Sequence, residues 1–164
     1  MTDKEYFIQL AADEAPRFER VMNALPADKL DWRPHERSRS AKELVDTMAG
    51  EALTFTTFLK TGVIDMAPPP EGWQKFASIT DAVAAMNRGL KEGATVAAGM
   101  SDADWASEAK MVMGGTDVWT TTKGGMALSL VLDLIHHRGQ LSTYIRPMGG
   151  KVPSIYGPSA DMNG

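Results

Sequence analysis

Apolar residues at helical spacing recur in four long segments, and this repeat constrains the fold more than any other feature of the chain. The segments span about residues 2–25, 40–60, 80–98 and 123–148. Side chains three and four positions apart share one face of a helix, and an apolar face must be buried against another element. Four amphipathic helices with modest connectors predict an all-α fold, an antiparallel four-helix bundle in a single domain over residues 1–164.

Signals between the segments refine this prediction. Pro16 should kink or restart the first helix, and Gly62 should end the second. Residues 101–122 lose the helical pattern around two adjacent glycines, which indicates a short β-hairpin or an irregular insertion before the last helix. The proline-rich stretch 66–73 indicates a stiff surface loop, and residues 149–164 indicate a coil tail.

The composition excludes several classes of function. The chain has 17 basic and 21 acidic residues, a net charge of −4 and no cysteine. Its basic residues form no run that could follow a phosphate backbone, so we expect no nucleic-acid partner. The absence of cysteine excludes disulfides, zinc–thiolate sites and a nucleophilic thiol. A polar N-terminus and the lack of a long apolar run predict a cytoplasmic protein with no membrane partner.

The last predicted helix places a carboxylate and an imidazole one turn apart. Asp133 and His137 are four residues apart, so both project from one face of the helix. That face is the stripe the helix should bury, which consists of Met126, Leu130, Leu134, Leu141 and Ile145. Buried ionisable groups require a partner because an unpaired buried charge is costly. A metal ion, a substrate, or an ion pair between the two would each supply that partner.

Motifs along the chain resemble those of the DinB-like proteins, a family of four-helix bundles. The residues that carry the likeness are Asp31-Trp32-Arg33-Pro34-His35, Ser40-Ala41-Lys42-Glu43-Leu44-Val45, His136-His137-Arg138-Gly139-Gln140-Leu141 and Arg146-Pro147-Met148-Gly149-Gly150-Lys151-Val152-Pro153. They cover most of the chain in the family's order, and the third motif is the most specific. The resemblance implies a DinB-type bundle, a homodimer, and a divalent metal (zinc or nickel) bound by three core histidines.

This chain departs from the implied ligand pattern at two of its three positions. His137 matches the last histidine, but Thr47 and Asp133 stand where the resemblance places the other two. A threonine hydroxyl is a poor ligand for zinc or nickel, and we expect it to bond back to the preceding helical turn. Glu51 lies one turn further along the same face. As a substitute ligand it would give a set of two carboxylates and one histidine, which suits harder metals.

Three neighbours of His137 are candidate pocket-lining residues, namely His136, Arg138 and Gln140. His136 should lie at the flank of the helix, about 100° away from His137. We expect Arg138 to pair with an acidic group such as Glu43 or Glu51. We expect Gln140 to satisfy a buried polar atom.

Two functions remain open. The loss of two ligands favours a degenerate site without a metal cofactor, in a bundle of undetermined activity that acts as a small-ligand-binding or interaction module. The alternative is a metal-dependent hydrolase or thiol-dependent transferase that uses His137 and Asp133. A metal would lower the pKa of a bound water or thiol. The thiol would have to belong to a small molecule, because the chain has no cysteine.

Overall fold

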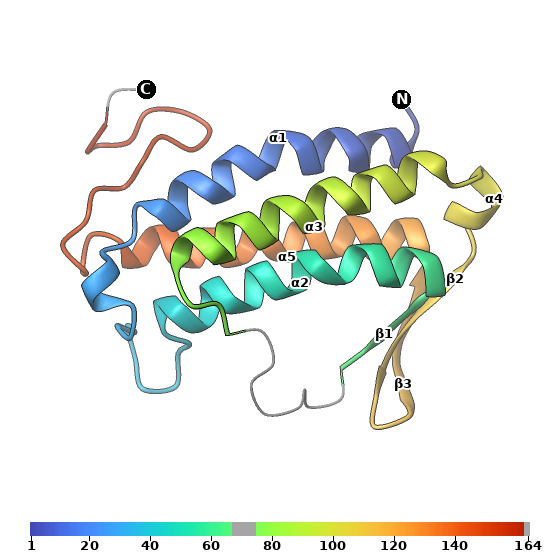
Figure 1. Cartoon of the computed structure of the whole chain (residues 1–164), viewed down its shortest axis with the longest axis horizontal. Coiled ribbons are helices and arrows are strands. Elements are labelled where there is room, and N and C mark those ends of the chain that lie inside the picture. The colour runs from blue at the N-terminus through green and yellow to red at the C-terminus, as the bar shows by residue number, and fades with distance from the viewer. Residues whose placement is uncertain (67–74, 163–164) are drawn as a thin grey trace.

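Four long helices form the body of the protein in a computed structural model that describes residues 1–66 and 75–162 (Figure 1). The helices are α1 (Asp3–Asn23), α2 (Ala41–Thr61), α3 (Ile79–Gly99) and α5 (Lys123–Tyr144). Two short helices, η1 (Ala27–Lys29) and α4 (Asp102–Trp105), lie in the connectors. The predicted four-helix bundle is confirmed, and the ends of the first three helices agree with the sequence pattern to within two residues.

The four helices form a square in which consecutive helices are not always neighbours. Both α1 and α2 pack against α3 and α5, so α1 and α2 lie on one diagonal. Figure 1 shows that α1 and α5 run in one direction and α2 and α3 in the other. The bundle is therefore antiparallel between α1 and α3 and between α2 and α5. Its other two neighbouring pairs are parallel, which simple alternation along the chain does not predict.

The helix ends follow the sequence signals with two differences. Thr2 and Ser40 form the expected capping boxes, and Gly62 ends α2 in the left-handed region with φ of 76°. Helix α1 continues through Pro16 and does not restart there, since buried residues on both sides hold it in place. Helix α5 ends at Tyr144 and is followed by turns, four residues earlier than expected, because Pro147 lacks the amide hydrogen that a further helical turn needs.

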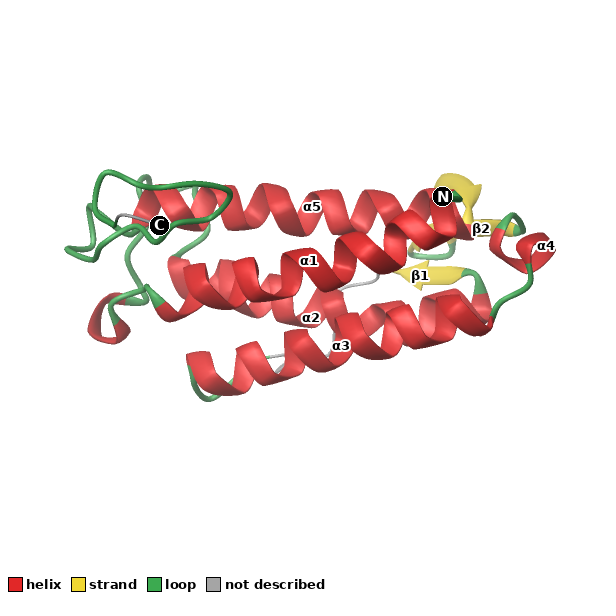
Figure 2. Ribbon diagram, turned by 90° about the horizontal axis from the view of Figure 1, so that it is seen from above, coloured by secondary structure: helices red, strands yellow, loops and turns green. Residues whose placement is uncertain are grey.

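A small sheet covers one end of the bundle (Figure 2). Strands β2 (Glu108–Met113) and β3 (Thr116–Thr122) form an antiparallel hairpin, which confirms the first of the two predicted alternatives. The turn uses Gly114 and Gly115, whose φ angles of 57° and 79° favour glycine. Strand β1 (Val63–Asp65) pairs in parallel with β2, which the sequence pattern did not predict.

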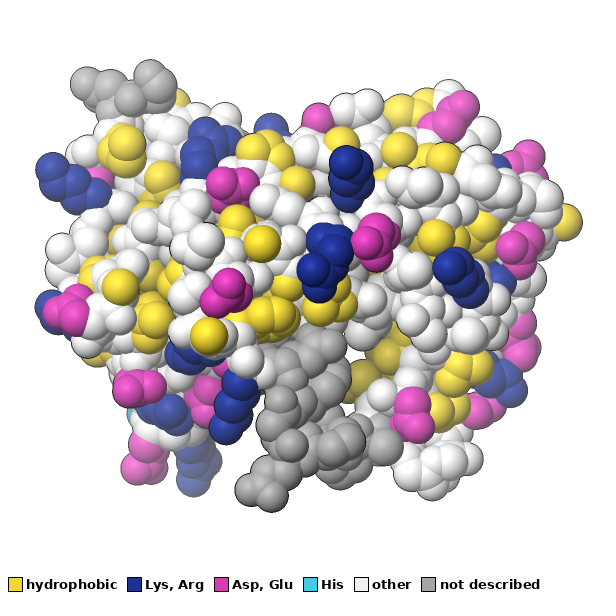
Figure 3. Space-filling model, in the orientation of Figure 1, with side chains coloured by type: hydrophobic (Ala, Val, Ile, Leu, Met, Phe, Trp, Pro, Cys, Tyr) yellow, Lys and Arg dark blue, Asp and Glu magenta, His cyan; other side chains and the backbone are white. Residues whose placement is uncertain are grey.

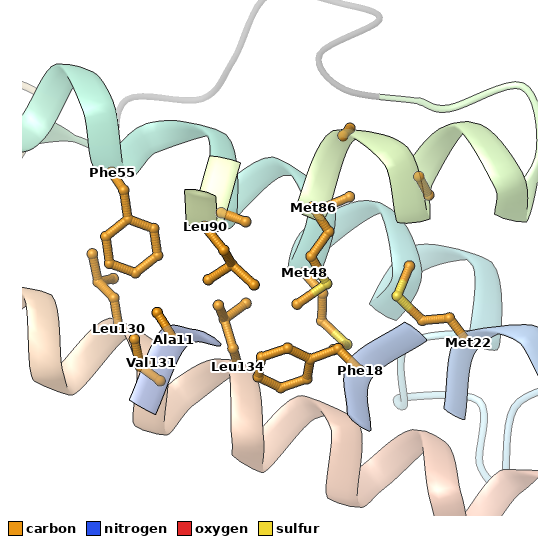
Figure 4. Close-up of a cluster of buried hydrophobic side chains, with 14 of the residues drawn as sticks. Ala11, Phe18, Met22, Met48, Phe55, Met86, Leu90, Leu130, Val131 and Leu134 are labelled. Atoms are coloured by element: carbon orange, nitrogen blue, oxygen red, sulfur yellow. The ribbon is translucent and has the colours of Figure 1, made fainter. Parts of the chain in front are cut away.

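The core fills the space between the four helices, as Figure 4 shows for side chains that include Phe18, Met48, Phe55, Leu90 and Leu134. Helices α2 and α3 approach closely at Gly89, where a Cβ atom would overlap the backbone of Ala52. The apolar stripe predicted for the last helix is buried, since Met126, Leu130, Leu134, Leu141 and Ile145 all belong to the core.

The remaining predictions about chain organisation concern the connectors and the tail. Residues 149–162 contain no helix or strand, as expected, while residues 163–164 lie outside the described part of the chain. Most of the proline-rich stretch 66–73 also lies outside it. Within the described residues, none of the helices combines the length and apolar character needed to cross a membrane.

Candidate metal centre

Helices α2 and α5 bring three potential metal ligands together. Glu51 from α2 and Asp133 and His137 from α5 each offer one ligand atom, and these atoms all lie within 4.8 Å of one another. Within residues 1–66 and 75–162 they form the one cluster of three or more such side chains. The site therefore unites the Asp133–His137 pair with the residue that the sequence offered as the substitute for Thr47.

The two α5 residues contact each other directly. Nε2 of His137 lies 3.3 Å from Oδ2 of Asp133. His137 is 9% exposed, as its place on the apolar stripe predicted. The side chain of Asp133 is 53% exposed, so the prediction that it is buried is wrong. Asp133 lies at the edge of the buried stripe, where it faces both the imidazole and solvent.

Glu51 is the most perturbed ionisable group of the site. Burial raises its pKa to about 8, and both the negative charge of Asp133 and a hydrogen bond with it act in the same direction, while the positive charge of Arg39 opposes them. Without a cation, Glu51 therefore holds a proton at neutral pH. Its Oε2 atom is buried and has no hydrogen-bond partner among the described residues. A buried oxygen without a partner is costly, which indicates a missing ligand.

Thr47 lies one turn before Glu51 and lines the same cavity. Its hydroxyl donates a hydrogen bond of 2.8 Å to the backbone oxygen of Glu43, which confirms the expected bond to the preceding turn. Thr47 is therefore already satisfied within its own helix. Glu51 supplies the stronger ligand atom from α2.

A cavity of about 410 Å³ opens over the side chains of Glu51, Asp133 and His137. Its walls come from α2, α5 and the sheet, and the lining residues include Arg39, Thr54, Ile64, Met111, Trp119, Ser129 and Leu130. The volume suits a small molecule. The sequence pattern did not place any sheet residue at the site, because the parallel pairing of β1 with β2 joins segments far apart in the chain.

The three residues that we expected to line the pocket do not border this cavity. His136 is exposed, which agrees with its predicted place at the flank of α5. Arg138 is 3% exposed and forms a buried ion pair with Glu14 of α1, so the predicted pairing with Glu43 or Glu51 is wrong. Its Nη2 atom also donates a hydrogen bond of 2.7 Å to the hydroxyl of Tyr156 in the tail.

Gln140 does satisfy a polar atom, as expected. Its side-chain oxygen lies 2.9 Å from Nδ1 of His137. Both ring nitrogens of His137 therefore have an oxygen neighbour, Gln140 on one side and Asp133 on the other.

A second hollow lies between α1 and α3 and has a volume of about 600 Å³. Its lining is mainly small and apolar, with Ala11, Ala12, Ala15, Ala94 and Ala98. Figure 3 shows hydrophobic side chains in small groups among acidic and basic ones on the face where α3 lies in front. The hollow contains no cluster of described metal-ligating side chains. The chemistry is therefore concentrated in the cavity between α2, α5 and the sheet.

The donor set fits a divalent cation. Two carboxylates and one imidazole are competent ligands for Zn²⁺, Mn²⁺ and Fe²⁺, and they leave positions open for water or substrate. Two ligand atoms on one tetrahedral cation, with bonds of about 2.1 Å, lie about 3.4 Å apart. The most widely separated pair of ligand atoms must therefore close by up to about 1.4 Å, through changes of side-chain rotamer. The buried Oε2 of Glu51 would then gain a partner.

Comparisons with known proteins agree with this architecture. The solved structure of the DinB-like protein YjoA from Bacillus subtilis superposes on this protein with a TM-score of 0.66. The two sequences are 17% identical, and the match covers 90% of this chain and 95% of the YjoA chain. YfiT from Bacillus subtilis, described as a probable metal-dependent hydrolase with an unusual four-helix bundle topology, is 15% identical, covers 89% of this chain and 87% of its own, and has a TM-score of 0.68.

At these identities the likeness concerns the fold. No protein with a curated description matches the chain. The sequence model of the DinB family matches residues 1–163, which is nearly the whole chain. The protein therefore belongs to the DinB family.

Proposed function

We propose that the protein is a metal-dependent hydrolase whose cation is held by Glu51, Asp133 and His137. The observation that carries the proposal is the convergence of these three ligand atoms within 4.8 Å at the floor of a cavity. The buried Oε2 of Glu51, which has no hydrogen-bond partner among the described residues, also supports it. A related fold, YfiT, is described as a probable metal-dependent hydrolase.

The donor set favours Mn²⁺ or Zn²⁺ over Ni²⁺. Carboxylate oxygens suit harder cations, whereas the three-histidine set implied by the family pattern suits zinc or nickel. Glu51 takes the place of the missing α2 histidine, and Asp133 takes that of the missing α5 histidine. The two carboxylates also compensate the charge of a divalent cation, which an all-histidine set does not do.

A bound cation would lower the pKa of water and polarise a carbonyl or phosphoryl group. The residues of the chain prepare the site for that chemistry. Met111, Trp119 and Leu130 form an apolar wall that excludes bulk water from one side of a ligand. Arg39 lines the same cavity. The positive charge of its guanidinium partly opposes the rise in the pKa of Glu51. Its positive charge favours substrates that carry a negative group.

The test compares two neighbouring positions of α2. Glu51→Gln should weaken Mn²⁺ and Zn²⁺ binding by at least about 10- to 100-fold and abolish metal-dependent hydrolysis of a panel of aryl esters, amides and phosphates. Thr47→Ala is the matched control, since it lines the same cavity one turn earlier, and it should leave metal affinity within about threefold. Equal metal affinity for the wild type and Glu51→Gln would contradict the proposed ligand set.

A second candidate function is a ligand-binding module without a metal. The contact of 3.3 Å between His137 and Asp133 favours it, because the pair satisfies itself. In that case Mn²⁺, Zn²⁺ and Ni²⁺ should all fail to raise the melting temperature. Small anionic ligands should then raise it in the wild type and not in Arg39→Gln.

A further inference from the structure

The two ring nitrogens of His137 face different partners. Nδ1 lies 2.9 Å from the side-chain oxygen of Gln140, three residues further along α5. Nε2 lies 3.3 Å from Asp133 on the side of the metal-ligand cluster. Gln140 is half-buried and does not border the cavity. It therefore contacts the imidazole from behind, away from any substrate.

We propose that Gln140 is a positioning residue of the metal centre, and the inference rests on the metal site proposed above. Its Oε1 accepts a hydrogen bond from the Nδ1–H group of His137. A neutral imidazole carries one proton, so a proton fixed on Nδ1 leaves the lone pair on Nε2. Nε2 then points its lone pair toward Glu51 and Asp133, which is the tautomer that a metal ligand requires.

The packing of α5 supports this role. Arg138 lies between His137 and Gln140 in the sequence. Its side chain points to the other side of the helix, where it contacts Glu14 and Tyr156. Its guanidinium also stacks over the ring of Phe18 at 5.3 Å. These contacts fix the rotation of α5 about its axis. Gln140 then constrains the orientation and the tautomer of the His137 ring.

Zinc affinity measures the effect of this contact. Gln140→Leu removes the acceptor and should weaken Zn²⁺ binding by about 10- to 100-fold, as measured by competition with a chromophoric chelator. Gln140→Glu keeps an acceptor and should bind Zn²⁺ at least as tightly as the wild type, since a carboxylate partner makes the imidazole a stronger donor. Gln9→Leu, the same substitution at an exposed position of α1, is the matched control and should leave the Zn²⁺ affinity unchanged. Melting of the metal-free proteins verifies that each variant folds.

A spectroscopic readout separates positioning from a general structural role. In the Zn²⁺-loaded wild type and Gln140→Glu, the Nδ1 proton of His137 should give a slowly exchanging NMR signal. The signal should be lost by rapid exchange in Gln140→Leu. If Gln140→Leu binds Zn²⁺ as tightly as the wild type, or if Gln140→Glu binds it more weakly, the positioning role is refuted and the metal site stands. If the wild type itself binds neither Zn²⁺ nor Mn²⁺, both proposals are refuted.

Discussion

The raised pKa of Glu51 predicts how the stability of the metal-free protein depends on pH. Its pKa is about 8 in the folded protein, against an ordinary value of 4.5. Between these values the folded state binds one proton more than the unfolded chain. The free energy of unfolding should therefore fall by up to about 1.4 kcal/mol per pH unit. The free energy of unfolding is therefore highest below about pH 4.5, where this stabilisation is fully present. It falls as the pH rises from there, and the stabilisation is lost once the pH has passed 8.

Over the whole interval this effect amounts to at most roughly 5 kcal/mol, and water in the cavity reduces it. Glu51→Gln carries a neutral amide at every pH and should lack the slope. Urea unfolding of both proteins in the presence of a chelator, at intervals from about pH 5 to pH 9, measures the difference. We expect the wild type to lose about 2–4 kcal/mol relative to the variant over this pH range. Parallel curves would refute the claim that Glu51 holds a buried proton.

Other contacts give predictions of their own. Metal binding near pH 7 should release about one proton, because Glu51 must lose its proton to become a ligand. Calorimetry in buffers of different ionisation enthalpy measures the number of protons released, and a release of zero would contradict the proposed role of Glu51. Gly89→Ala should cost about 3 kcal/mol because the added Cβ overlaps the backbone of α2. Gly139→Ala should instead stabilise the protein by about 0.5–1 kcal/mol, because no atom of the described residues lies within 4 Å of the added Cβ. Urea unfolding compares these two, and similar effects would contradict the packing described. By the same measurement, Glu14→Gln should cost about 3–5 kcal/mol because it leaves Arg138 buried without its charged partner, and a cost near zero would show that the pair is dispensable.

The helices were predictable because their signals are local. Capping residues, Gly62 and the apolar stripes each act within a few turns of the chain. The parallel direction of α2 and α3 and the pairing of β1 with β2 depend on contacts between distant segments. No local pattern encodes such contacts, so the sheet wall of the cavity could not be predicted.

The candidate site was predictable in part for the same reason. The pairing of Asp133 with His137 follows from their spacing of four residues on one helix. The choice between Thr47 and Glu51 depended on the rotation of α2 relative to α5, which the sequence leaves open. The predicted partner of Arg138 was wrong because the actual partner, Glu14, is 124 residues away in the chain. The packing of α1 on α5 brings the two side chains together. The homodimer implied by the family resemblance stays a prediction.

The most direct test of the metal site is the metal content of the protein itself. Elemental analysis of freshly purified, untagged wild type should find about one divalent cation per chain, and zinc or manganese should restore that content after removal by a chelator. His137→Ala, purified in parallel, should contain little or none. A wild type that contains no metal and takes up none from either solution would contradict the account. It would leave the second candidate function, a ligand-binding module in which Asp133 and His137 pair with each other.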